Sequence, residues 1–335
     1  MSRHPVLARA DGSHRFYLWG DPPEGYWSVT TVIDGGVPKY LVPWAAKTVA
    51  DLVIADLETM RPHSRASTLR RRWMRSGREW VAALQAAGKL TSIKKAERLD
   101  ELELVARWLK GQPERIRDTA AELGSDVHSE ADTLVRGLAL ASGDAYAHGL
   151  PMPEWPERLR GHMTAFGRFL ADCRPTYLAT EATVFNRTQA YAGTLDAIID
   201  LPGRMVLAAL LAAGTAGDDI PGWLHDAAAV DGLVTIVVDY KSGRAVYPTV
   251  ALQLAAYARS EFVGLPDGVT QLPLPRVDLG AVLHLTPTGY ALRLVQIDEP
   301  VYRAFLHARE VYRFNRELAG HVLGAPVFAS AKEAA

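Results

Sequence analysis

The stretch from Val234 to Gly243 constrains the fold more than any other part of this 335-residue chain. It reads Val-Thr-Ile-Val-Val-Asp-Tyr-Lys-Ser-Gly, an apolar run that ends in two charged residues and a turn. Such a run predicts a buried strand. Because side chains alternate along a strand, we expect Asp239 and Lys241 side by side on one face, at the end of a rigid element. An exposed ion pair at a strand end would explain the same spacing.

The hydrophobic period changes from helical to alternating near the middle of the chain. The first half predicts helices, after short strands or a loose cover in residues 1–30. These helices span about residues 43–60, 67–87, 93–109, 114–140 and 156–173. The second half predicts strands and two helices. The strands span 177–185, 193–201, 234–240, 277–285 and 290–297, and the helices 249–262 and 299–318. Residues 202–232 look like an insertion. The layout indicates an α/β core with an N-terminal helical region.

Composition gives the chain no overall attraction for nucleic acid. Lys and Arg number 37 and Asp and Glu 38, so DNA binding would have to come from a local patch. The single cysteine, Cys173, excludes a disulfide framework and any cluster held by several thiolates. No apolar run is long enough to cross a bilayer, and the N-terminus lacks the apolar core of a signal peptide. We therefore expect a soluble intracellular protein.

Three further side chains are candidates for a metal site. Asp196 stands in an otherwise apolar strand, where a carboxylate is costly to desolvate unless a cation or donor meets it. Asp200 is a competitor on the same face. His128 lies next to the apolar stripe of the 114–140 helix, and a neutral imidazole is a good metal ligand, although a lone helical histidine is more often simply packed. Glu181, on the polar face of its strand, belongs either to the same site or to an ordinary exposed surface.

Two groups of residues are candidates for contacts with a nucleic acid. Gln253 and Tyr257 share one face of a helix and can bond to phosphate oxygens or to a catalytic lysine, although such a pair is also common in helices. Residues 61–78 contain seven arginines, and arginine forks pair with phosphates while tryptophan stacks on bases. The candidates there are Arg70, Arg71, Arg72, Arg75 and Trp73. Their charge spreads around a helix, so part of it is simply solvated.

Taken in order, these elements resemble the RecB/AddB-type nuclease domain of the PD-(D/E)xK superfamily. The Cas-four group of CRISPR-adaptation exonucleases and their phage-encoded relatives belong to it. The resemblance covers about residues 115–300. Its matching parts are Gly124-x-x-x-His128, Glu181, Gly193-Thr-Leu-Asp196, Asp239-Tyr-Lys241-Ser-Gly and Gln253-x-x-x-Tyr257. The opening from Ser28 to Lys47 also resembles that of phage-encoded members.

The resemblance implies a restriction-endonuclease-like core, with a mixed sheet flanked by helices. The core would span residues 115–323 with the insertion at about 202–232, between an N-terminal cover and helical region at 1–114 and a flexible tail at 324–335. The resemblance further implies that Mg²⁺ or Mn²⁺ is held by His128, Asp196, Asp239 and the main-chain carbonyl of Tyr240. Lys241 would activate water, with Gln253 and Tyr257 orienting it and Glu181 nearby. These side chains must then meet at one place.

The implied activity is metal-dependent exonuclease cleavage of DNA that leaves 5′-phosphate ends, in recombination, repair or phage DNA processing. Many relatives hold an iron–sulfur cluster with four cysteines, and we expect none here because Cys173 is alone. Expected partners are single-stranded DNA or duplex ends, a helicase or recombinase, and a second copy of the chain. The expected location is the cytoplasm of a bacterial or phage-infected cell. A catalytically silent DNA-binding or assembly protein, and a metal hydrolase of small molecules, stay open as alternatives, and so does the role of the insertion as a lid, a substrate guide or an oligomer contact.

Overall fold

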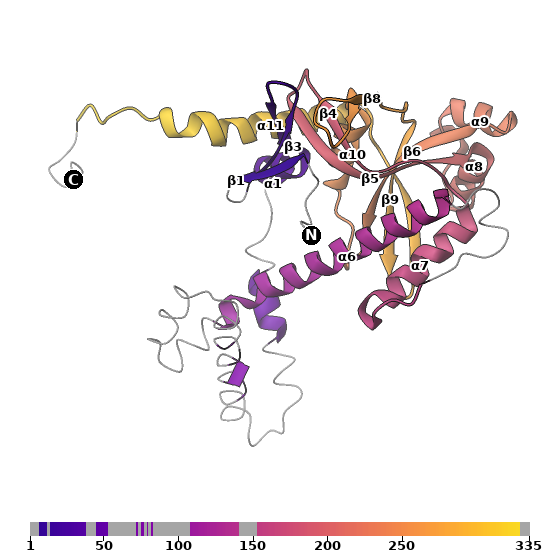
Figure 1. The fold of residues 1–335 in the computed structure, drawn as a ribbon, viewed down its shortest axis with the longest axis horizontal. Helices are drawn as coiled ribbons and strands as arrows, with labels where there is room; N and C mark the ends of the chain where they lie inside the picture. Colours follow the sequence, from indigo (N-terminus) through magenta and orange to yellow (C-terminus); the bar gives the residue numbers. More distant parts are fainter. Residues whose placement is uncertain are drawn as a thin grey trace. The chain divides into compact units, whose positions relative to one another are not determined.

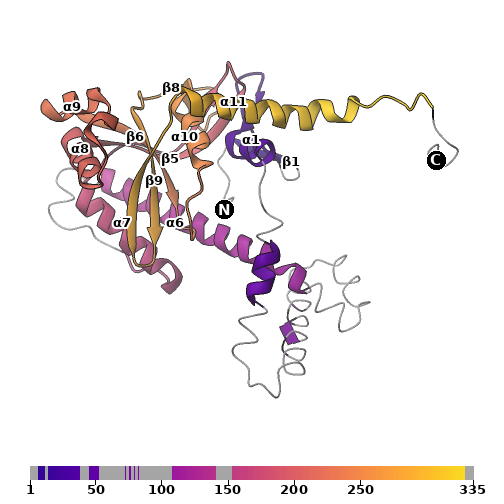
Figure 2. The same ribbon diagram turned by 180° about the vertical axis from the view of Figure 1, so that it is seen from behind.

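The chain divides into two compact units. The computed structural model describes residues 7–11, 14–37, 45–52, 72, 75, 76, 79, 82, 108–140 and 153–328. One unit joins Met1–Pro38 to Leu123–Ala335, and the other spans Lys39–Glu122. This division differs from the N-terminal region expected at 1–114, because the first 38 residues belong with the core. The first unit contains the sheet and most of the described helices (Figures 1 and 2).

The described strands of the first unit form one ten-stranded mixed sheet. They are β1 (Ala8–Asp11), β2 (His14–Trp19), β3 (Glu24–Ser28), β4 (Thr176–Asn186), β5 (Tyr191–Pro202), β6 (Leu233–Lys241), β7 (Phe262–Gly264), β8 (Gln271–Pro273), β9 (Leu279–Thr286) and β10 (Gly289–Val295). One path runs β1-β2-β3-β5-β4-β7-β8, and β6, β9 and β10 continue the sheet from β5. The pairs β3–β5 and β6–β9 are parallel and the others antiparallel.

Helices cover both faces of this sheet (Figures 1 and 2). They are α1 (Val29–Gly36), α6 (Gln112–Leu140), α7 (Glu157–Cys173), α8 (Gly203–Ala212), α9 (Gly222–Ala229), α10 (Val250–Ala258) and α11 (Glu299–Arg313). The helices α6 to α9 pack on one face, with Phe166 and Leu224 fully buried there, and α1, α10 and α11 pack on the other around Phe305. Strand β6 lies between these two layers, which explains why its sequence is apolar on both faces.

Where the structure describes the chain, most elements predicted from periodicity are confirmed, including the 114–140 helix, the hairpin of β4 and β5, and strand β6. Most of the residues expected to form helices over 43–60, 67–87 and 93–109 lie outside the described residues. One described element differs. The helix expected over 249–262 ends at Ala258, because Phe262 instead enters strand β7 and stacks on Phe185 with ring centroids 5.2 Å apart. Of the two alternatives for residues 1–30, short strands are confirmed, and they extend the main sheet through the β3–β5 pair.

The insertion at 202–232 folds into α8 and α9, which join the core. Val206 of α8 and Leu224 of α9 are buried in the same cluster as α6 and α7. Elsewhere, no helix in the described ranges is long and apolar enough to cross a membrane.

Candidate metal and catalytic site

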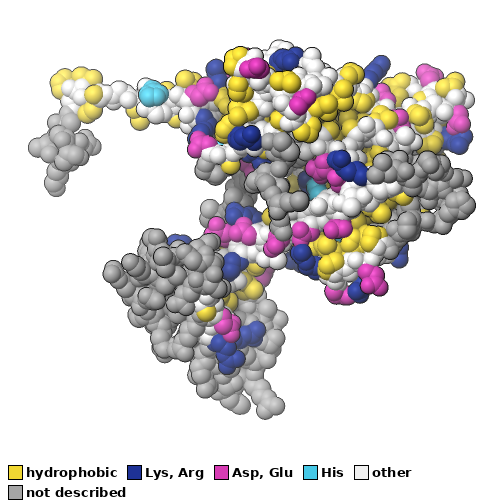
Figure 3. Space-filling view, in the orientation of Figure 1, with side chains coloured by type: hydrophobic (Ala, Val, Ile, Leu, Met, Phe, Trp, Pro, Cys, Tyr) yellow, Lys and Arg dark blue, Asp and Glu magenta, His cyan; other side chains and the backbone are white. Residues whose placement is uncertain are grey.

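A cavity of about 750 Å³ opens beside α6, β4 and β5. Most of its charged lining is acidic, and we call it the acidic cavity. Its charged and imidazole side chains are Asp126, Asp132, Glu181, Asp196, His128, Arg15 and Arg136. Arg136 pairs with Asp132 at 2.8 Å on the wall of α6. Figure 3 shows charged side chains of both signs close to a histidine on this face of the molecule.

The floor of the site is a fork between β5 and β6. The ladder that joins these strands ends at the pair Ala197–Val238, and Asp196 and Asp239 are the next residues on each strand. Beyond this point β6 pairs only with β9, whereas β5 turns toward β3. The fork frees main-chain groups from the ladder, and the Asp196 carboxylate satisfies one of them by accepting a hydrogen bond of 2.6 Å from the Tyr240 amide. The strand separation therefore brings two carboxylates to one point.

Strand β4 is distorted opposite Asp196. Pairing between β4 and β5 continues on both sides of Glu181 but omits the Glu181–Asp196 pair, and Glu181 has a φ of 45°. Left-handed backbone is unfavourable for a residue with a Cβ, and in the interior of a strand it is uncommon and often accompanies a functional site. The distortion lets ligand atoms of His128, Glu181 and Asp196 lie within 4.8 Å of one another.

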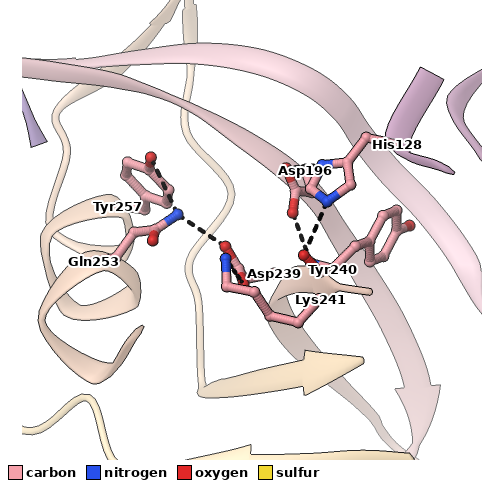
Figure 4. A network of polar contacts seen from close by, with 7 residues as sticks. All are labelled: His128, Asp196, Asp239, Tyr240, Lys241, Gln253 and Tyr257. Atoms are coloured by element: carbon pink, nitrogen blue, oxygen red, sulfur yellow. Dashed lines mark hydrogen bonds and ion pairs between the residues drawn. The ribbon is translucent and has the colours of Figure 1, made fainter. Parts of the chain in front are cut away.

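His128 reaches the fork from α6 (Figure 4). Its Nδ1 lies 3.2 Å from Asp196 Oδ1, and its Nε2 lies 2.9 Å from the carbonyl oxygen of Tyr240. Because both partners are acceptors, both nitrogens carry hydrogen and the imidazole is positively charged. One turn earlier, Gly124 has no side chain, and a Cβ there would lie 3.4 Å from Ser242 Oγ. Helix α6 therefore lies close to the turn that follows Lys241.

A second group lies on the α10 side of the fork (Figure 4). Lys241 Nζ is 2.6 Å from Asp239 Oδ2, and Gln253 Nε2 donates to Asp239 Oδ1 at 2.8 Å and to the Tyr257 hydroxyl at 3.5 Å. The Asp239 side chain is 3% exposed and that of Lys241 is 36% exposed, so the ammonium reaches solvent while its carboxylate partner does not.

Gly193 explains how Tyr257 reaches this position. A Cβ at Gly193 would lie 2.5 Å from Tyr257 Cε1, so only a glycine lets the ring pack against β5. In the Gly-Thr-Leu-Asp segment, Gly193 therefore makes room for the Tyr257 ring, and Asp196 supplies a carboxylate to His128 and the Tyr240 amide.

The carboxylates and the imidazole shift one another's proton affinities. Burial raises the pKa of Glu181 to about 7, and the charge of Asp196 adds to this. Burial and Asp196 likewise raise the pKa of Asp239 to about 6, against the opposing Lys241 ammonium. Burial alone would lower the pKa of His128, but the Asp196 carboxylate raises it to about 9. Burial would raise the pKa of Asp196, and the charge of His128 holds it below its ordinary value instead.

The donor set fits a divalent cation. Three carboxylates, one imidazole and one main-chain carbonyl lie around the fork, and oxygen ligands with a histidine suit Mg²⁺ or Mn²⁺. Within the described ranges, the buried Asp239 Oδ2 accepts no hydrogen bond of good geometry, and its charge is balanced by the ion pair with Lys241 and by the nearby charge of His128. The protonated His128 places a positive charge among the carboxylates of the fork, and a bound cation would place a positive charge at the same point.

The structure separates the candidates that the sequence left in competition. Asp196 lies at the fork, while Asp200 lies four residues along β5 and accepts a 2.7 Å hydrogen bond from Thr235 Oγ1. Of the expected metal ligands, His128 and Asp196 are brought together, with Glu181 as the third member of their group. The expected ligand Asp239 lies outside this group, in contact with Lys241 and Gln253, and Gln253 also contacts Tyr257. Asp132 was missed, although its spacing of four residues from His128 on one helix indicates the same face.

The arginine-rich segment belongs to the second unit. Arg72 and Arg75 are helical and exposed. Arg70, Arg71 and Trp73 lie outside the described residues. A role of this segment in binding DNA therefore stays a prediction.

A scan against models of protein families and a search of curated proteins found no match to this chain. Its function is therefore inferred from the geometry of the fork.

Proposed function

We propose that this protein is a divalent-metal-dependent deoxyribonuclease with an active site of the PD-(D/E)xK kind. The observation that carries the proposal is the fork of β5 and β6, where Asp196 and Asp239 are the first residues beyond the ladder. Lys241 follows on the same face of β6, 2.6 Å from Asp239. Two acids and an amine at the point where two strands separate match the needs of phosphodiester hydrolysis, which must neutralise charge on the phosphate and position a water.

In this proposal the cation is held by His128, Glu181, Asp196, Asp239 and the carbonyl oxygen of Tyr240. When bound, it supplies Lewis-acid stabilisation of the negative charge that develops on the phosphate. The protein prepares these ligands in two ways. The Tyr240 amide fixes one oxygen of Asp196, and the left-handed backbone at Glu181 turns that side chain into the cavity.

Lys241 is the proposed catalytic amine. Its partial exposure allows its ammonium to contact both a water and a phosphate oxygen, and Asp239 limits where it can point. Gln253 is a positioning residue, because its amide holds Asp239 from behind while Tyr257 holds the amide. The order of contacts runs from the core outward, so the reactive group rests on a rigid support.

The same proposal extends to the setting. The substrates are single-stranded DNA or duplex ends, the mode of cleavage is exonucleolytic, and the products carry 5′-phosphates. The process is recombination, repair or phage DNA processing in the cytoplasm. The partners are a helicase or recombinase and a second copy of this chain.

The test is cleavage of end-labelled single-stranded and duplex DNA with Mn²⁺, with Mg²⁺ and with EDTA. We expect cleavage with either cation, none with EDTA, and loss of about 100-fold or more of the rate in Lys241→Ala and Asp196→Asn. Asp200→Asn is the matched control, because it changes the same residue type on the same strand away from the fork. DNA binding without metal-dependent cleavage would instead identify a catalytically silent DNA-binding protein, and equal rates in Asp196→Asn and Asp200→Asn would contradict the proposed site.

A further inference from the structure

A second hollow, of about 580 Å³, lies beside α10, β9 and β10. Among the described residues that line it, none is acidic, and three carry cationic or imidazole groups: Arg244, His284 and Arg293. The ring of Tyr247 also lines it and is 68% exposed. We call this hollow the basic groove.

The register of the sheet connects the basic groove to the fork. Asp239 pairs with Val282 on β9, and Val282 pairs with Arg293 on β10. Paired residues project to the same face of a sheet, so Arg293 lies on the face of Asp239. Two strand spacings separate them, about 10 Å in all. In the next row Lys241 pairs with His284, so the groove begins beside the proposed catalytic amine.

The turn after Lys241 forms one wall of the groove. His284 Nε2 donates to the carbonyl oxygen of Gly243 at 2.7 Å, and this bond fixes the turn that leads to Arg244. Arg244 is exposed and enters the groove from the loop, while Arg293 enters from β10. Two cations from different elements thus line one hollow, and His284 in the same lining pairs with Lys241 across the sheet.

Among the described residues, Arg244 and Arg293 lack acidic partners, whereas several other arginines of this unit, such as Arg136 and Arg158, have them. In the acidic cavity Arg136 pairs with Asp132, but in the described part of the chain neither Arg244 nor Arg293 forms an ion pair. The first turn of α10, which also borders the groove, holds no acidic residue. The paired N–H groups of a guanidinium fit the oxygens of a phosphate, and an exposed tyrosine ring can stack on a base.

We propose that the basic groove binds a segment of single-stranded DNA that adjoins the phosphodiester at the fork. The inference rests on the proposed nuclease function and names which strand form the site takes. Arg244 and Arg293 contact successive phosphates, and Tyr247 stacks on an unpaired base. A duplex keeps its bases stacked on one another, so it cannot offer a base to Tyr247. The groove therefore favours a single strand over a duplex.

The experiment measures binding of a fluorescent oligodeoxythymidine, and of a duplex of equal length, to the full chain in EDTA. We expect the double variant Arg244→Ala/Arg293→Ala to bind the single strand at least about tenfold more weakly. Its salt slope should be smaller by about 1.4, because each phosphate contact on a single strand contributes about 0.7. Tyr247→Ala should weaken single-strand binding about fivefold or more and leave duplex binding unchanged.

Arg276→Ala is the matched control, because Arg276 is 94% exposed and lines neither hollow. Affinity and salt slope in the double variant equal to those of this control would overturn the inference, and so would a wild type that binds no single strand. The two proposals fail separately. Mn²⁺-dependent cleavage that is lost in Lys241→Ala but unaffected by the groove variants would keep the nuclease and remove the groove. Binding of single-stranded DNA that depends on Arg244 and Arg293, without any cleavage, would support the groove and contradict the nuclease function.

Discussion

The acidic cavity lies beside β4 and β5, the basic groove lies beside β9 and β10, and the two differ in charge. The cavity, beside α6, contains four carboxylates, and the groove, beside α10, has two arginines and no acid among its described lining residues. His128 and Asp196 of the cavity both contact main-chain atoms of Tyr240, while Asp239 and Lys241 lie on the side of Gln253 and α10 (Figure 4). A net charge of −1 for the whole chain conceals this separation.

The contrast shows how one strand end can serve a cation and a polyanion together. Successive side chains of a strand point to opposite faces, so Asp239 lies on the side of α10 with Lys241, while Tyr240 packs in the core beneath α6. The charged side chains of the cavity and those of the groove are separate sets, because no residue lines both hollows. In the proposed function the two meet only at the fork.

The strongest test of this separation removes charge from each side in turn. We expect Asp239→Asn to lower kcat about 100-fold or more while DNA binding persists, because the variant loses a negative charge but no phosphate contact. Arg244→Ala/Arg293→Ala should instead raise KM with kcat nearly unchanged. Steady-state cleavage of labelled single-stranded DNA separates the two. Equal losses of kcat in both variants would show that the two sides are one functional unit.

The second effect concerns stability with metal. A ligand that binds only the folded state at about 100 times its Kd stabilises it by about 2.7 kcal/mol. We expect Mn²⁺ to raise the free energy of unfolding by this amount in the wild type and in Arg244→Ala/Arg293→Ala, and to have little effect in Asp196→Asn. Urea titrations with and without Mn²⁺ measure the difference. A response that survives in Asp196→Asn would place the cation away from the fork.

Local patterns were enough to predict much of this arrangement. Apolar periodicity located strand β6 and the helices α6 and α7, and simple alternation placed Asp239 beside Lys241. Alternation failed on β5. It puts Asp196 and Asp200 on one face, yet the pleat is interrupted opposite Glu181, and Leu195 and Ala197 fall into core clusters on different faces of the sheet. This interruption of the alternation arises from contacts between β4 and β5, so it cannot be predicted from the spacing of residues within β5 alone.

The basic groove could not be predicted for a different reason. Its side chains come from a loop and two neighbouring strands, and the register between β9 and β10 decides that Arg293 shares a row with Asp239. The sequence instead drew attention to the arginines of residues 61–78, where charge is dense. A high density of arginines along the chain is a weaker guide to a phosphate-binding site than arginines from different elements that line one hollow.

A third prediction tests the packing that supports both sides. Gly193→Ala would place a methyl group 2.5 Å from the Tyr257 ring. Overpacking of this kind costs about 1–3 kcal/mol, and it should displace the amide of Gln253 that holds Asp239. We expect lower stability in urea together with slower cleavage. Gly217→Ala is the control, because a Cβ there meets nothing within 4 Å. Slower cleavage with full stability would show that the Tyr257 contact matters for positioning alone.

The smallest effect is a dependence on pH that only one side should show. Metal binding needs the neutral imidazole and ionised carboxylates, so protons must leave His128, whose pKa is about 9, and Glu181, whose pKa is about 7. Both pKa values lie above those of ordinary side chains of their type, so protons compete more strongly as the pH falls. Mn²⁺ affinity should rise with pH between 6 and 8.5, about tenfold per unit above pH 7 and more steeply below it, which is about 1.4 kcal/mol per proton and pH unit. Calorimetry in buffers of different ionisation enthalpy counts the released protons.

Guanidinium groups keep their charge over this range, so the difference in single-strand affinity between wild type and Arg244→Ala/Arg293→Ala should stay constant. A flat Mn²⁺ affinity would remove His128 from the ligand set, and a groove contribution that changes with pH would mean that the cavity and the groove are electrostatically coupled.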